Sequence, residues 1–218
     1  MKHAFLAVLA LAAIHACGTA WAHTEKPGAA GAKQAAPIEN IKESSAGTRD
    51  ARTYFTDLEL LTQDGRKVRF YSDVLEGRTV VINVIYTNCK DACPLITQQL
   101  NDVRRRIPDL FGKQVHFVTL TSDPKRDSPQ ALKQFARAQS ADLPGWTFLT
   151  GSKENVDQIL KKLGQYSKEV EGHSTLLIAG NVPAKRWSKI RPDAPAEAIA
   201  ERLTVLAADE GAAAAVKP

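Results

Sequence analysis

The sequence predicts an α/β fold of three layers, in which helices cover both faces of a central mixed sheet. Segments with the apolar pattern of buried strands alternate along the chain with segments of helical periodicity. The composition is that of an ordinary globular domain, with 44% hydrophobic and 24% charged residues. A core of roughly 150 residues buries enough surface to fold without disulfides.

The elements follow one another in a definite order. Asp64-Gly65 lies between two apolar segments and is a strong signal for a hairpin turn. The continuous β-branched run from Val80 to Tyr86 is typical of a strand buried on both faces. The predicted strands are Phe55–Leu61, Lys67–Tyr71, Val80–Tyr86, Val115–Thr121, Trp146–Leu149, Thr175–Ala179 and Ala184–Ile190.

Helices are predicted between these strands. Apolar residues recur at helical spacing after Pro94, and Ser128-Pro129 and Ser152 are typical helix starts. Gly164 ends the helix that Ser152 begins, and Pro195–Leu206 closes the domain. An N-terminal hairpin followed by strand, helix, strand, helix, hairpin and helix predicts a thioredoxin-like fold.

The N-terminal segment predicts an exported protein. An apolar stretch from Ala4 to Ile14 is followed by Ala20-Trp21-Ala22, which is typical of a cleavage site. We therefore expect residues 1–22 to be a signal peptide and the mature protein to be periplasmic. Lipid attachment at Cys17, which would anchor the protein to the membrane, remains an alternative.

The rest of the chain divides into three parts. Residues 23–52 are rich in Ala, Gly, Lys and Pro and predict a flexible linker. Residues 53–206 are expected to form the folded domain, and residues 207–218 a disordered tail.

The net charge of +5 comes from scattered basic residues. No nucleic-acid partner is therefore expected, and weak association with a membrane surface is compatible with this charge.

Cys89 and Cys93, in the run TNCKDACP, are the residues that carry chemistry. They follow a buried strand, where open α/β sheets place their sites, and precede a helix whose N-terminal N–H groups favour thiolate. Pro94 suits the first helical position, so we expect Cys93 at or next to the N-cap. Since Cys17 is removed or lipidated, this pair is the only thiol site of the mature chain.

The spacing of the pair leaves metal binding and redox chemistry both open. Three residues separate the cysteines, where a thioredoxin-type redox site has two. The wider loop can close as a disulfide and also gives both sulfurs room to reach one metal. Soft thiolates favour Cu(I) or Zn(II), and a closed zinc site needs four ligands. A three-coordinate site of two sulfurs and one nitrogen suits Cu(I) better, while an inert core pair or a structural disulfide is less favoured.

Three histidines and one aspartate are candidates beside the dithiol. His173 precedes a predicted strand and, taken alone, is typical of a surface or capping residue. His116 lies within a strand pattern and is expected to be structural, while His23 would become the N-terminus after cleavage and could chelate Cu(II). Asp123 ends the second buried strand at the edge of the cysteines. It either caps a loop or supports the site or a partner's docking.

The runs YTNCKDACP, LTSDPKRDSP and EGHSTLLI, in this order, resemble the Sco/SenC family of copper proteins over about residues 53–206. The resemblance implies that Cys89, Cys93 and His173 bind a copper ion, as Cu(I) or Cu(II), and that Asp123 is the family's motif aspartate. Lys90 stands where many members have proline.

The resemblance also implies a function. The expected role is that of a copper metallochaperone that delivers copper to, or matures, the dinuclear copper centre of cytochrome c oxidase. Its partner would be the subunit that holds this centre, or another copper protein. The alternative is a thiol–disulfide oxidoreductase that keeps the cysteines of a copper-site partner reduced.

Overall fold

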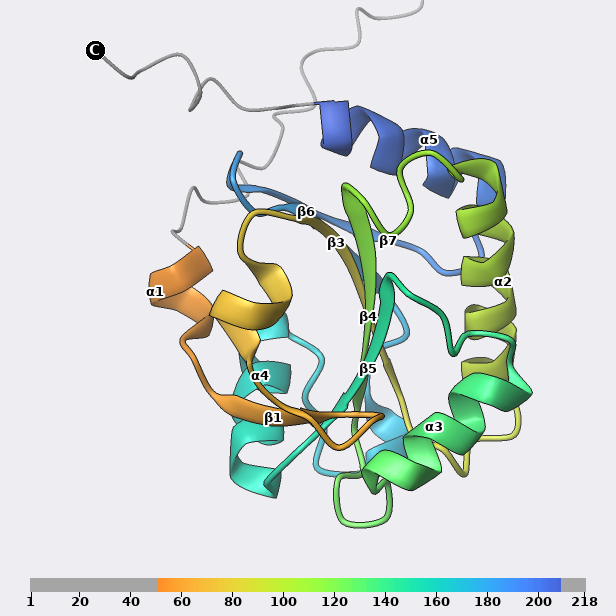
Figure 1. Cartoon of the computed structure of the whole chain (residues 1–218). Coiled ribbons are helices and arrows are strands. Elements are labelled where there is room, and N and C mark those ends of the chain that lie inside the picture. Colours follow the sequence, from red (N-terminus) through yellow and green to blue (C-terminus); the bar gives the residue numbers. More distant parts are fainter. Residues whose placement is uncertain (1–50, 209–218) are drawn as a thin grey trace, which may run out of the picture. The chain divides into compact units, whose positions relative to one another are not determined.

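A computed structural model describes residues 51–208, and Figure 1 shows the mixed sheet of this region with its helices. The expected signal peptide, Cys17, His23 and nearly all of the expected linker lie outside the described residues. The sheet of the described region has seven strands in the order β2-β1-β5-β4-β3-β6-β7. These strands are β1 (Glu59–Thr62), β2 (Lys67–Arg69), β3 (Thr79–Ile85), β4 (Val115–Thr121), β5 (Trp146–Thr150), β6 (Leu177–Asn181) and β7 (Arg186–Ile190).

The directions of the strands make the sheet mixed. β3, β4 and β5 run parallel, whereas β1, β6 and β7 pair antiparallel to their neighbours. β1 and β2 form an antiparallel hairpin at one edge. The predicted mixed sheet with an N-terminal hairpin is therefore confirmed.

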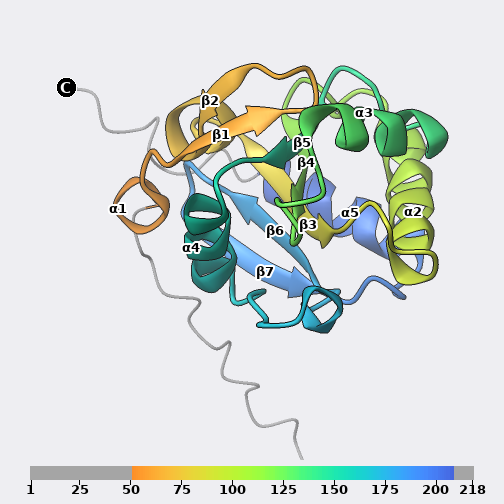
Figure 2. The same ribbon diagram turned by 90° about the horizontal axis from the view of Figure 1, so that it is seen from below.

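Helices cover both faces of the sheet. Figure 2 shows α1 and α4 on one face and α2, α3 and α5 on the other. The helices are α1 (Ala51–Phe55), α2 (Ala92–Arg106), α3 (Pro129–Ala138), α4 (Lys153–Leu163) and α5 (Ala196–Ala208), with the short turns η1 (Phe70–Leu75) and η2 (Val170–Gly172). None of the helices within residues 51–208 is both long enough and apolar enough to cross a membrane.

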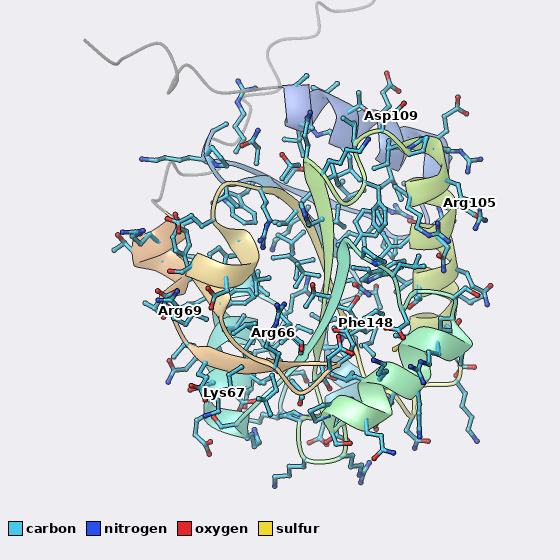
Figure 3. All side chains as sticks on the ribbon, viewed as in Figure 1. Arg66, Lys67, Arg69, Arg105, Asp109 and Phe148 are labelled. Carbon is cyan, nitrogen blue, oxygen red and sulfur yellow. The ribbon has the colours of Figure 1, made fainter. Side chains whose placement is uncertain are left out.

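Two hydrophobic cores lie between these layers, and β3 contributes to both. All seven residues of β3 are buried. Because side chains alternate along a strand, Val81 and Ile85 face the core under α2 and α5, and Val80 and Ile82 face the core under α4. Figure 3 labels Phe148 of β5, whose ring packs against Phe135 of α3 with centroids 6.3 Å apart.

The first predicted strand is wrong over its N-terminal half. Phe55 ends α1, and β1 begins only at Glu59. Thr56 adopts a positive φ of 60°, so the backbone turns there and cannot continue as an extended strand. The ring of Phe55 packs edge-on against that of Phe70, at a centroid distance of 5.6 Å. α1 also takes in Ala51 and Arg52, which were assigned to the linker.

Basic side chains project from the N-terminal hairpin and are partly neutralised within the chain. Figure 3 labels Arg66, Lys67 and Arg69 on this part of the structure. Lys67 forms an ion pair with Glu59 at 3.0 Å, and Arg69 forms one with Asp73 at 3.1 Å. These pairs are exposed, so they contribute little to stability.

Candidate functional site

The candidate site lies at the carboxyl ends of the parallel strands β3 and β4. The two strands end side by side, with Ile85 paired to Thr121. The chain leaves β3 through the turn that carries Cys89, and it leaves β4 through the loop that carries Asp123. Both connections run along the lower edge of the sheet in Figure 1. The sheet therefore brings together two segments that are more than 30 residues apart in the sequence.

The sulfur of Cys89 caps the N-terminus of α2. The helix begins at Ala92, and the side chain of Asp91, at the N-cap position, makes no capping hydrogen bond. Instead, the N–H of Cys93 donates to Sγ of Cys89 over 3.3 Å. One of the helix N–H groups that lack an intrahelical acceptor is thereby satisfied by a sulfur, which favours the thiolate form.

The helix starts earlier than the sequence suggested. We expected Pro94 at the first helical position, and Cys93 at or next to the N-cap. The structure places Cys93 at the second and Pro94 at the third helical position. Proline is tolerated there because N–H groups of the first turn have no intrahelical acceptor.

The two thiols differ strongly in acidity. Burial raises the pKa of Cys89, but hydrogen bonds from the Cys93 thiol, from backbone N–H groups and from the Tyr86 hydroxyl outweigh burial, so the pKa falls below its usual value of 9.0. Burial, followed by the hydrogen bond to Cys89, raises the pKa of Cys93 to about 12. When the pair loses its first proton, the thiolate therefore forms on Cys89, and Cys93 keeps its proton.

Accessibility divides the two cysteines in the same way. Cys93 is only 2% exposed and belongs to the core under α2, whereas Cys89 is partly exposed. Both thiols are free in this structure. Cys89 is thus the sulfur that an incoming metal or disulfide meets first, and Cys93 is the sulfur behind it.

His173 lies next to Tyr86, the residue that contacts Cys89, and its imidazole is in the neutral form that binds metals. Its Nδ1 is 3.1 Å from the carbonyl oxygen of Ser174, an arrangement that makes Nδ1 the donor and leaves Nε2 available. Burial lowers the pKa of His173 from 6.5, so the imidazole is neutral at pH 7. A neutral imidazole with one nitrogen fixed in this way is the form that binds metals.

Tyr86 links the histidine to the dithiol. Its ring meets the ring of His173 edge-on, with centroids 6.0 Å apart and planes at 84°. Its hydroxyl hydrogen-bonds with Cys89, and this bond, together with burial, raises the pKa of Tyr86 to about 12. A single aromatic residue thus contacts both parts of the predicted ligand set.

The structure does not gather the three predicted ligands into one cluster. Within residues 51–208, no group of three His, Cys, Asp or Glu side chains lies close enough to hold one metal ion. The two cysteines lie together, whereas His173 contacts the ring of Tyr86. Three-ligand binding would require His173 to shift toward the sulfurs.

Asp123 lies at the predicted edge but contacts neither cysteine. Its side chain is largely buried and faces Arg126 at 3.6 Å, and its backbone N–H donates to the hydroxyl of Thr121 over 2.9 Å. Together with His173 it lines a hollow of about 440 Å³. The side chain therefore borders the histidine side of the site.

His116 lies in β4, among the residues of the strand as expected. It is half buried, and its Nδ1 has no hydrogen-bond partner among the described residues. Burial, followed by the nearby Arg78, lowers the pKa of His116. It is the second residue of β4, the strand that Asp123 follows, so it lies near the end of β4 away from the dithiol.

Asp127 is a residue of the site that sequence reasoning missed. It is 1% exposed, and its carboxylate accepts hydrogen bonds from the N–H and the hydroxyl of Thr87 and from the hydroxyl of Thr121. It is the second aspartate of the run DPKRDSP, of which only the first was singled out. A second acid four residues after the first was the available signal.

Comparison with known proteins finds one family repeatedly. A sequence model of the SCO1/SenC family matches residues 46–205. The SCO1 protein homolog of Bacillus subtilis is 30% identical over 117 residues, which are 53% of this chain and 59% of that protein. This chain thus spans less than two thirds of the length of that relative.

Solved structures show the same architecture. A SCO1/SenC family lipoprotein from Bacillus anthracis superposes with a TM-score of 0.60 at 26% identity, over 68% of this chain and 92% of that one. ScoI of Bradyrhizobium japonicum with copper bound has a TM-score of 0.58 at 22% identity, over 68% of this chain and 96% of that one. The predicted thioredoxin-like fold is thereby confirmed.

Proposed function

Because this chain belongs to the SCO1/SenC family, we propose that it is an exported copper metallochaperone. Cys89, Cys93 and His173 would bind one copper ion and pass it to another copper protein by ligand exchange. The proposed recipient is the subunit that holds the dinuclear copper centre of cytochrome c oxidase. The copper-bound state of the relative from Bradyrhizobium japonicum supports copper as the cargo.

The observation that carries the proposal is the sulfur of Cys89 at the start of α2. Thiolate is the form that binds soft metal ions, and the hydrogen bonds to Cys89 lower its pKa. Cys93 must lose its proton when copper binds, because its pKa is about 12 in the metal-free protein. Copper binding should therefore release protons from the dithiol.

His173 would complete the site through Nε2. Its pKa is already lowered by burial, so no proton needs to leave the imidazole at pH 7. The two cysteines already lie together, and no group of three metal-binding side chains is formed within residues 51–208, so we expect copper to bind the dithiol first and His173 second. Two thiolates and one imidazole make a donor set that suits Cu(I).

Anaerobic titration of the reduced mature protein with Cu(I), in competition with a chelator of known affinity, tests this assignment. We expect one copper per chain, and His173→Ala should weaken binding by on the order of 10- to 100-fold. His116→Ala is the matched control, since this histidine is also half or more buried, has a lowered pKa and lies away from the dithiol. Unchanged affinity in His173→Ala would refute the ligand assignment.

A second candidate function is thiol–disulfide exchange, which the difference in acidity between the two cysteines favours. The Cys89 thiolate would attack a partner disulfide, forming a mixed disulfide and releasing one partner thiolate. Cys93 would then lose its proton and attack Sγ of Cys89, releasing the second partner thiolate. Two electrons pass to the partner, and a Cys89–Cys93 disulfide remains.

Turnover of a disulfide substrate separates the two functions. Exchange should persist in His173→Ala, since no step needs the imidazole, and it should vanish in Cys89→Ser. Absence of turnover in the unmodified protein would exclude exchange as a main activity. Copper titration of the same samples then reports on the chaperone function alone.

The place of action is proposed from the sequence and from one relative. The N-terminal segment has the features of an export signal, and the relative from Bacillus anthracis is a lipoprotein. A periplasmic or membrane-anchored protein would work where the copper centre of an oxidase is assembled. Mass determination of the mature protein would distinguish cleavage after Ala22 from lipid attachment at Cys17.

A further inference from the structure

Asp127 is a buried carboxylate that forms no ion pair with any residue in the described part of the chain. It is 1% exposed, and the ion pairs found within residues 51–208 do not include it. A buried charge is costly unless hydrogen bonds satisfy it. Its partners are the N–H of Thr87 at 3.1 Å and the hydroxyls of Thr87 and Thr121.

Thr87 connects this carboxylate to the dithiol through one peptide group. The N–H of Thr87 and the carbonyl of Tyr86 belong to the same planar unit, and they point in opposite directions. The N–H is held by Asp127, and the carbonyl accepts the N–H of Cys89 over 3.1 Å. Fixing one side of this peptide therefore fixes the acceptor that holds the backbone of Cys89.

Asp127 is also held by a contact with the end of β4 and by its place just before the start of α3. Thr121 ends β4, and Asp127 immediately precedes Ser128, whose side chain caps α3 by accepting the N–H of Ala131. The backbone N–H of Asp127 donates to the carbonyl of Asp123 over 2.9 Å. The peptide before Cys89 is thus anchored to β4 and α3, which are rigid elements.

We propose that Asp127 is a positioning residue that sets the reactivity of Cys89, by fixing the Tyr86–Thr87 peptide and with it the place of the Cys89 sulfur at the start of α2. The inference deepens the proposed function, because it concerns the thiol that meets copper or a disulfide first. Asp127 acts on the sulfur only through Thr87 and Tyr86.

Electrostatics and positioning predict opposite effects when the carboxylate is removed. A negative charge near a thiol disfavours thiolate, so charge alone predicts that Asp127→Ala makes Cys89 more reactive. Positioning predicts a less reactive Cys89, because the sulfur loses its aligned N–H donors. Asp127→Asn should retain most of the reactivity, since its carbonyl oxygen can accept the Thr87 N–H and its amide can donate to the Thr87 hydroxyl.

The test measures alkylation of Cys89 by iodoacetamide in the reduced, metal-free protein at one neutral pH, with the modified residue identified by mass spectrometry. We expect Asp127→Ala to slow alkylation at least about threefold, because thiolate is the reacting form, and Asp127→Asn to react at nearly the wild-type rate. Alkylation of Asp127→Ala at the wild-type rate or faster would overturn the proposal.

Two further variants keep the test decisive if Asp127→Ala does not fold. Thr87→Val removes one donor to the carboxylate within the dithiol turn, and it should also slow alkylation. Asn181→Ala removes a buried amide that donates to the carbonyl of Leu206 over 2.7 Å, at the strand end paired with the start of β3, and it should leave the rate unchanged. Equal rates in these two variants would refute positioning. Copper titration is a separate measurement, so the proposed function can fail or stand independently.

Discussion

The dithiol turn and the histidine segment, residues 165–176, are held in the fold in very different ways. The dithiol turn joins a fully buried strand to a 15-residue helix and is fastened by a buried carboxylate. The histidine segment contains only the short turn η2 between α4 and β6. It is tied by Gln165, which donates to the carbonyl of Leu176 over 2.8 Å, and by Ser122, which donates to that of Val170 over a long 3.3 Å.

This difference shows that the fold holds the three candidate ligands in place to different degrees. The two sulfurs are placed by elements whose displacement would disrupt the core, because Cys93 itself belongs to it. His173 is placed by a segment with few ties, next to a hollow of about 440 Å³. Local opening is easiest where buried contacts are few, so the histidine is the part of the site that can move.

Loss of the Cys89 sulfur should have the largest effect on copper affinity of the changes considered. Cys89→Ser should lower copper affinity more than about 100-fold, beyond the usual effect of altering a supporting residue. Competitive Cu(I) titration against wild type and His173→Ala measures this effect. If His173→Ala loses as much affinity as Cys89→Ser, the two regions contribute equally and the inequality described above is wrong.

Substitutions of Tyr86 should affect the dithiol turn and the histidine segment separately, since its hydroxyl contacts Cys89 and its ring contacts His173. Tyr86→Phe keeps the ring beside His173 but removes the hydroxyl that helps to lower the pKa of Cys89. The pKa of Cys89 should rise, and its alkylation at pH 7 should slow by about two- to fivefold. Tyr86→Leu removes the ring as well, and it should additionally alter the NMR signals of His173. A variant Tyr86→Phe with unaltered thiol reactivity would show that the hydroxyl does not act on the sulfur.

Acidification should loosen the histidine segment and leave the dithiol turn in place. The pKa of His173 in the folded protein lies below its unfolded value of 6.5, so its neutral form contributes stability above pH 6.5. This contribution is lost as the pH falls through the folded pKa. We expect stability to decrease from pH 7 to pH 5, and to decrease less in His173→Gln.

The same direction of shift applies to His116, which provides the control. Its pKa is also lowered, by burial and by Arg78, so it adds to the loss of stability in acid. His116→Gln should reduce the pH dependence of unfolding without changing the hydrogen exchange of residues 165–176. Exchange that rises in acid equally in His173→Gln and in wild type, after correction for intrinsic rates, would contradict the role of His173.

Removal of a helix cap should give the smallest effects. It should lower the stability of the fold without changing the position of the Cys89 sulfur. Ser128 caps α3 beside the dithiol turn, and Ser152 caps α4 on the other face. Each change to alanine should cost about 1 kcal/mol of unfolding free energy, measured by urea denaturation. Neither should change the alkylation rate of Cys89. A slower rate in Ser128→Ala alone would mean that anchoring of the dithiol turn extends to this cap.

The parts of the molecule that sequence reasoning predicted are those encoded locally. The run VVINVI is buried on both faces as a central strand must be, although the strand ends at Ile85, one residue before the partly buried Tyr86. Ser152 and Gly164 bound α4 as their residue types indicate. The place of Cys89 and Cys93 at the end of that strand followed from the same local pattern. Asp64-Gly65 likewise gave the hairpin of β1 and β2.

The parts that were missed depend on distant contacts. Asp127 acts on Thr87, 40 residues away, and no local pattern contains that pairing. The contacts of Tyr86 with His173 arise only after β3 and the histidine segment meet in space. The direction of the chain before β1 depends on Thr56, whose positive φ is not a preference of threonine. Tertiary packing decides these features.

The sulfur of Cys89 at the start of α2 has a consequence for the redox potential of the pair. A thiolate at this position is stabilised by helix N–H groups, and a disulfide sulfur, which carries no charge, gains less from them. Stabilisation of the reduced form makes a dithiol a better oxidant. The Cys89–Cys93 disulfide should therefore have a potential above the value of about −300 mV below which structural disulfides lie. A cellular reductant of moderate strength would then suffice to return the protein to the form that accepts copper.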